Sequence, residues 1–226
     1  MAELLPLFPL NLVLFPYVAL PLHIFEERYK EMIGEVITGK SEFGVLCDDA
    51  DTVANVGCTA KVVKEIQRYD DGRMDILTVG LRRFQIIRLQ QDKTYLQGEV
   101  HFFMDEPVDE RQELKARCLQ LFQDLYESTP GHIPFADLET VSTEEVSFFI
   151  AYYSDFPLEK KQRLLELTNA EERLVVEEEA LHERLDGQRE QRGRHQILES
   201  NGHFPQTLVA KTELVFNHVE SIASIP

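Results

Sequence analysis

Residues 34–41 read GEVITGKS and match GxxxxGK[ST], the pattern of phosphate-binding loops. Residues 100–106 read VHFFMDE and resemble the apolar strand ending in Asp-Glu that holds magnesium in such enzymes. This chemistry requires a strand, then a loop of backbone amides, then a helix whose N-terminus faces the phosphate. Here the order is reversed, because an amphipathic helix pattern precedes Gly34 and a short strand pattern, Phe43–Cys47, follows Ser41. We interpret Gly34 and Gly39 as a helix end and a turn, and keep nucleotide binding through Gly34–Ser41 as the less favoured alternative.

Other side chains that could carry chemistry do not form a recognisable site. The seven histidines are scattered, no HExxH sequence occurs, and the three cysteines (Cys47, Cys58 and Cys118) include no CxxC pair. An odd cysteine count without such a pair indicates neither a disulfide framework nor a zinc site. The sequence therefore predicts no catalytic residue, no metal and no cofactor, and a protein that is not an enzyme.

Charge is the most unusual bulk property of the 226-residue chain, whose formal net charge is −17. This balance disfavours nucleic acid and anionic membranes as partners, because both are bound mainly through Lys and Arg. Arg82, Arg83 and Arg88 follow a strand pattern and are expected to alternate outward and pair with nearby acids, which we favour over ligand binding. Glu177–Glu179 is expected to be a solvated helix face.

The segment Leu5–Tyr29 is almost wholly apolar, but four prolines interrupt it, at positions 6, 9, 16 and 21. Each proline fixes φ and removes a backbone donor, so the segment cannot form one long helix. We expect two short strands, Leu4–Leu10 and Leu12–Phe15, and then a crossing into a helix at Ile24. No Lys or Arg precedes the apolar part, which argues against an export signal and favours a cytoplasmic location.

Short strand patterns continue to about residue 106. A helix over Ile24–Ile37 is expected to bury one face, made of Phe25, Tyr29, Met32, Ile33 and Val36. Strands are expected at Phe43–Cys47, Thr59–Tyr69, Met74–Leu89 and Tyr95–Met104, with a hairpin turn at Asp70-Asp71-Gly72. Many short strands at even spacing predict a closed or half-closed barrel.

After Pro107 the apolar residues recur at helical spacing. Buried stripes are expected at Leu114, Cys118, Leu121, Phe122 and Leu125, at Val146, Phe149, Ile150 and Tyr153, at Leu158, Leu164 and Leu165, and at Leu174, Leu181 and Leu185. Capping signatures at Ser142–Glu145 and Thr168–Glu171 open the second of these helices and the last. We divide the chain into residues 1–106, 107–199 and 200–226, the last a tail that either packs back on the body or binds a partner.

An ordered set of motifs makes the chain similar to a known family. PLFPLNLVLFP followed by LPLHIFEERY resembles the opening of the Lon substrate-binding domain, the N-terminal module of Lon proteases. Further matching motifs are Phe43–Leu46, Val56–Ala60, Thr78–Phe84, Leu164–Leu167 and Glu171–Leu174. The resemblance implies an α+β fold: a β-rich PUA-like barrel with one inserted helix, then a helical subdomain ending in a long helix. It also implies a stand-alone, non-catalytic protein that binds polypeptides, either as an adaptor in protein quality control or as a free-standing recognition module. Because PUA-like barrels often bind RNA, nucleic-acid binding is the alternative, which the net charge opposes.

The best candidate binding residues lie in the uncharged loop Pro16–Pro21 and next to it. A loop this apolar either folds into the core, the interpretation we favour, or exposes an apolar patch. As a patch it would bind hydrophobic segments of other proteins, the role that the resemblance implies, through Phe15, Tyr17 and Leu20. The expected partners are unfolded or partly folded polypeptides, or a protease or chaperone, and a homodimer is compatible with the sequence.

Overall fold

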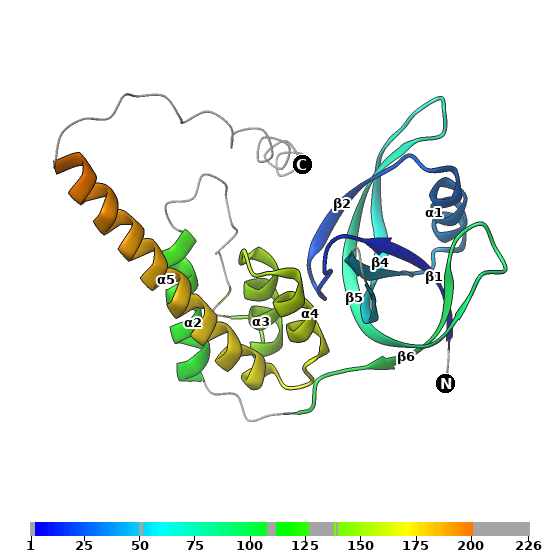
Figure 1. The fold of residues 1–226 in the computed structure, drawn as a ribbon. Coiled ribbons are helices and arrows are strands. Elements are labelled where there is room, and N and C mark those ends of the chain that lie inside the picture. Colours follow the sequence, from blue (N-terminus) through cyan, green and yellow to red (C-terminus); the bar gives the residue numbers. More distant parts are fainter. Residues whose placement is uncertain (1–2, 50–51, 108–111, 127–137, 139, 201–226) are drawn as a thin grey trace.

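The computed structural model describes residues 3–49, 52–107, 112–126, 138 and 140–200 (Figure 1). Within these ranges the chain forms a β-rich half followed by a helical half, and the change falls between Phe103 and Gln112. The expectations for the tail 200–226 lie almost entirely outside the described residues. No described helix has the length and hydrophobicity needed to cross a membrane.

Six strands form one mixed sheet with the order β2-β5-β4-β3-β1-β6. Their bounds are β1 Glu3–Leu10, β2 Ala19–Ile24, β3 Phe43–Asp49, β4 Thr52–Arg68, β5 Met74–Gln90 and β6 Gln97–Phe103. Among the described strand pairs, only β1–β3 is parallel. Strand β5 also pairs with β6, which closes β1, β3, β4, β5 and β6 into a ring. The predicted α+β barrel is therefore confirmed.

The two long strands β4 and β5 do more than complete this ring. The second half of β5 pairs with β6, whereas its first half, residues 74–79, pairs with β2. The first half of β5 also pairs with Lys61–Arg68 of β4, so a three-stranded extension of β2, β5 and β4 projects from the ring. The predicted turn at Asp70–Gly72 joins β4 to β5, and Gly72 has the positive φ of 82° that the turn requires.

The first apolar segment differs from the prediction. Residues 12–15 are not a strand, and the strand lies instead at Ala19–Ile24, where we expected a loop. Pro21 is tolerated there because β2 is an edge strand, so the missing N–H costs no ladder hydrogen bond on its outer side.

Helix α1, Glu27–Gly39, packs on the barrel and buries Tyr29, Met32, Ile33 and Val36 as predicted. The expectation for Phe25 is wrong, since its side chain is 60% exposed. The reason is the helix start: the N-cap is Glu26, so Phe25 lies before the helix and outside its periodicity.

The described part of the second half contains four helices: α2 Gln112–Tyr126, α3 Thr143–Tyr153, α4 Leu158–Glu166 and α5 Ala170–Ser200. The predicted capping box is present at α3, where Ser142 and Glu145 bond to each other's backbone amides. At α5 the Asn169 side chain accepts bonds from the amides of Glu171 and Glu172. The α2 and α5 stripes form a shared core with α3 and α4 that includes Cys118, Ile150, Leu164 and Leu181.

Two expectations about charged side chains are wrong. Arg83 is 2% exposed rather than outward-facing, and Glu177 is fully buried rather than part of a solvated face. Charged residues are rarely buried without a partner, which is why pattern alone placed both on the surface. Pairing of the arginines with acids is confirmed, since Arg82 pairs with Glu42, Arg83 with Asp105 and Arg88 with Glu99.

Candidate polypeptide-binding surface

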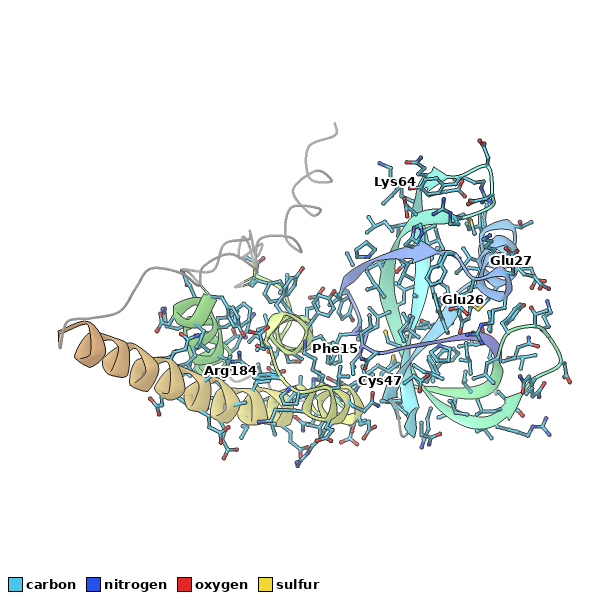
Figure 2. All side chains as sticks on the ribbon, turned by 45° about the horizontal axis from the view of Figure 1, so that its top comes forward. Phe15, Glu26, Glu27, Cys47, Lys64 and Arg184 are labelled. Carbon is cyan, nitrogen blue, oxygen red and sulfur yellow. The ribbon has the colours of Figure 1, made fainter. Side chains whose placement is uncertain are left out.

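The structure separates the three candidate binding residues. Phe15 is fully buried at the junction between the barrel and the helices (Figure 2), with its ring centre 5.9 Å from that of Phe148 on α3. Leu20 is also buried, where β2 pairs with β5 at Thr78. Tyr17 alone is exposed, by 54%. Part of the loop therefore packs into the core, through Phe15 and Leu20, and part of it is exposed, at Tyr17.

The backbone around Tyr17 is fixed to strand β5. The Tyr17 amide donates to the carbonyl of Gly80 at 2.9 Å, and the Gly80 amide donates to the carbonyl of Val18 at 2.9 Å. Tyr17 has a φ of 66°, an uncommon conformation for a large side chain, which the two bonds hold in place. The close approach requires glycine at position 80, since a Cβ there would lie 2.1 Å from the Phe15 carbonyl oxygen.

A buried ion cluster underlies this loop. The Asp105 carboxylate accepts hydrogen bonds from both Arg83 of β5 and Arg173 of α5. Arg83 also donates to the carbonyls of Leu165, at 3.0 Å, and Leu167. Burial lowers the pKa of Arg83, and the adjacent Asp105 opposes that shift. Asp105 belongs to the segment that resembles a magnesium-binding strand end in sequence. In the structure its carboxylate instead pairs with one arginine from each half of the protein.

The Phe148 ring lies between this ion cluster and the exposed Tyr17. The Arg173 guanidinium lies 4.1 Å from the Phe148 ring centre, and that ring contacts both Phe15 and Tyr17. The two aromatic contacts have ring centres 5.9 and 6.5 Å apart, within the range of favourable aromatic pairs. Tyr17 is thus an exposed aromatic residue on a rigid support.

The surface beside Tyr17 is acidic. Partial burial, followed by the nearby carboxylates of Glu144 and Glu145, raises the pKa of the Tyr17 hydroxyl. Burial and the neighbouring Asp105 also raise the pKa of Glu144. The phenol therefore stays protonated and can donate a hydrogen bond.

A second exposed aromatic residue, Phe25, was missed by the sequence interpretation. It stacks on His23, with ring centres 6.0 Å apart, beside a pocket of about 340 Å³ whose lining includes Phe8, Leu22 and Tyr29. Its exposure would have been predicted by a helix that begins after Glu26 instead of at Ile24. Glu26 is the N-cap of α1, so Phe25 lies outside the helix. Tyr17 and Phe25 flank the two ends of β2.

The segment that matches a phosphate-binding loop has a different geometry. Gly34 lies inside α1, not at a helix end as predicted, and Lys40 follows the helix with a φ of 49°. The amides of Lys40 and Ser41 donate to the carbonyls of Ile37 and Val36, so they are not free to surround a phosphate. Within the described ranges, no group of three or more His, Cys, Asp or Glu residues could hold a metal ion.

Comparison with known proteins gives one family. The family model described as "ATP-dependent protease La (LON) substrate-binding domain" matches residues 4–183. Two curated relatives are a Lon protease of Anaeromyxobacter dehalogenans, 28% identical over 79% of this chain, and Lon protease 2 of Myxococcus xanthus, 27% identical over 80%. These matches cover 23% and 24% of the relatives, so the chain spans about a quarter of their length.

Solved structures agree in fold. A Lon N-terminal domain protein from Xanthomonas campestris is similar with a TM-score of 0.62 and 24% identity, covering 77% of this chain and 96% of the other. The N-terminal domain of a Lon protease from the Mycobacterium avium complex has a TM-score of 0.65 and 20% identity, covering 80% and 98%.

Proposed function

The chain belongs to the family of Lon substrate-binding domains, and from this premise we propose that it recognises polypeptides without carrying out catalysis itself. The observation that supports this function best is Tyr17, an exposed aromatic side chain on a backbone held at both Tyr17 and Val18 by Gly80. Aromatic residues on rigid supports contribute strongly to binding, because they bury a large area and lose little conformational entropy.

The carboxylates beside Tyr17 favour a bound segment that carries a basic side chain. Glu144 and Glu145 lie close enough to affect the Tyr17 hydroxyl. A bound segment with an apolar side chain against Tyr17 and a Lys or Arg beside it would satisfy both features. Such segments are exposed in unfolded chains and buried in folded ones, which suits a module that distinguishes non-native proteins.

The test is fluorescence anisotropy of a labelled, permanently unfolded protein titrated with this chain. We expect saturable binding, with a Kd below about 1 mM, that Tyr17→Asp weakens at least about tenfold and Tyr17→Phe largely retains. Asp is tolerated at positive φ, so the variant is expected to fold. Val175→Asp, which changes another half-exposed apolar residue, is the control and should bind like the wild type. Absence of binding by the wild-type protein would refute the function.

We place this recognition in protein quality control, where the chain presents bound segments to a protease or a chaperone in the cytoplasm. The support for this role is the family itself, since the relatives with matching regions are Lon proteases. A pull-down of a purified candidate protease that is lost with Tyr17→Asp would support a shared surface.

A further inference from the structure

The outer edge of β4 has no partner strand over half of its length. Strand β3 pairs with β4 only up to Ala60, whereas β4 continues to Arg68 along β5. Among the residues that the structure describes, no other strand pairs with this edge between Lys61 and Arg68. The amides and carbonyls that point to the outer side of such an edge can bond to an added extended chain.

Helix α1 flanks this edge and leaves a groove beside it. One hollow of about 350 Å³ lies between the last turns of α1, at Val36–Lys40, and Lys61–Glu65 of β4. A second, of about 500 Å³, lies between the first turns of α1, Arg68 and the turn at Asp71–Gly72. Both hollows are lined by α1, and β4 contributes Lys61–Glu65 to the first and Arg68 to the second. The β4 edge of about 8 residues would span about 26 Å.

Two bulges present apolar side chains on this edge. The register places Val62 opposite Thr78 and Lys64 opposite Leu77, which leaves Val63 as an extra residue on β4. The same irregularity leaves Ile66 unpaired between Glu65 and Gln67. Both side chains are among the exposed large hydrophobics, at 54% and 43%. Bulges commonly redirect side chains at functional positions, and here they place two apolar residues at the surface.

At the end beside the last turns of α1, the groove carries a charge opposite to that of the whole protein. Lys40, Lys61 and Lys64 line the hollow beside the last turns of α1, and in the described part of the chain none of them has a carboxylate within ion-pair distance. Glu65, the acid on the same edge, is already paired with Arg68 at 2.6 Å. Figure 2 shows Lys64 on the projecting hairpin, far from the labelled Phe15. Three unpaired lysines on a chain of net charge −17 select a negatively charged ligand.

We propose that the groove between α1 and the outer edge of β4 binds an extended polypeptide segment in which acidic and apolar residues alternate. The backbone of the segment adds to the β4 edge, its acidic side chains face Lys40, Lys61 and Lys64, and its apolar side chains contact Val63 and Ile66. A free strand edge and apolar residues favour a peptide over a nucleic acid, which would use the lysines alone. This site rests on the proposed function, since it adds a second surface for polypeptides, one that prefers acidic segments.

The experiment uses the full chain and three labelled probes: a ten-residue peptide alternating Val and Glu, its counterpart alternating Val and Lys, and a single-stranded oligonucleotide. We expect the Val-Glu peptide alone to bind saturably. The double variant Lys61→Glu, Lys64→Glu should weaken it about tenfold or more. The control, Lys160→Glu with Arg163→Glu on α4, changes the net charge equally and should leave binding unchanged. Val63→Ser with Ile66→Ser, which keeps the charge, should also weaken binding.

The outcomes separate the two proposals. If the labelled unfolded protein binds in a Tyr17-dependent manner but the Val-Glu peptide does not, the groove is wrong and the function stands. Equal losses in the groove and control variants would show that net charge alone drives binding and would overturn the groove. Binding of the oligonucleotide in preference to the Val-Glu peptide would overturn it too, and failure of every polypeptide probe would overturn both proposals.

Discussion

The carboxylate of Asp105 and the guanidinium of Arg173 form a two-point ion pair between residues 68 positions apart in the chain. Asp105 follows the last strand of the barrel, and Arg173 lies in the first turn of the long helix α5. Both side chains are buried, with exposed fractions of 8% and 0%. The pair therefore joins the two halves of the protein in a place where water cannot replace it.

Removing the Asp105 charge should destabilise the whole protein. In Asp105→Asn, the buried Arg83 and Arg173 lose their common counter-charge, and breaking one partner of a buried pair costs about 3–5 kcal/mol. Urea unfolding followed by circular dichroism measures the loss. Glu99→Gln, which removes the exposed pair with Arg88, is the control and should cost less than about 1 kcal/mol. Similar losses in the two variants would contradict a special role for the cluster.

The sequence predicted features that depend on neighbours along the chain and missed those that depend on distant residues. The turn at Asp70–Gly72 and the capping box at Ser142 are set by a few adjacent residues, and both are present. Burial of Arg83 depends on Asp105 and on carbonyls of α4 and the residues after it, which no local pattern shows. Exposure of Tyr17 likewise depends on Gly80, which lies on another strand.

Glu177 should make stability fall as the pH rises. Its carboxyl is fully buried, and neither oxygen has a hydrogen-bond partner among the residues that the structure describes. Burial raises the pKa of this carboxyl well above 4.5, although Arg173 opposes the shift. The folded protein therefore holds this proton more tightly than the unfolded chain. The stabilisation is complete below about pH 4.5 and decreases as the pH rises toward the folded-state pKa.

Glu177→Gln tests whether this buried carboxyl causes the pH dependence, because the amide has nearly the same shape and cannot ionise. Relative to the wild type, the variant should become more stable as the pH rises from about 5 to about 8, because it lacks the carboxyl that ionises in the wild type. Urea unfolding at both pH values gives the difference. The exposed neighbour Glu179 provides the control, since Glu179→Gln should show no such trend. A pH-independent difference between Glu177→Gln and the wild type would disprove the assignment.

Gly80→Ala should disturb the loop that presents Tyr17. The new Cβ would lie 2.1 Å from the Phe15 carbonyl oxygen, and backbone atoms cannot move aside as a flexible side chain can. We expect a loss of about 1–3 kcal/mol and weaker binding of unfolded protein. Gly187→Ala, on an exposed turn of α5, should be neutral or stabilising, because the new Cβ would meet no described side chain within 4 Å. A fully stable Gly80→Ala variant with normal binding would show that the loop is not fixed by this contact.

Gly34→Ala distinguishes a helix interior from a phosphate-binding loop. Apart from the adjacent backbone of α1, no atom of the described residues lies within 4 Å of a Cβ built at Gly34. Replacing glycine inside a helix should therefore stabilise the protein by about 0.5–1 kcal/mol. The amides of Lys40 and Ser41 are already bonded to helix carbonyls, so magnesium and ATP should leave the melting temperature of both proteins unchanged. Thermal unfolding with and without nucleotide measures both effects. A nucleotide-dependent increase in the wild type that Gly34→Ala abolishes would restore the nucleotide-binding alternative.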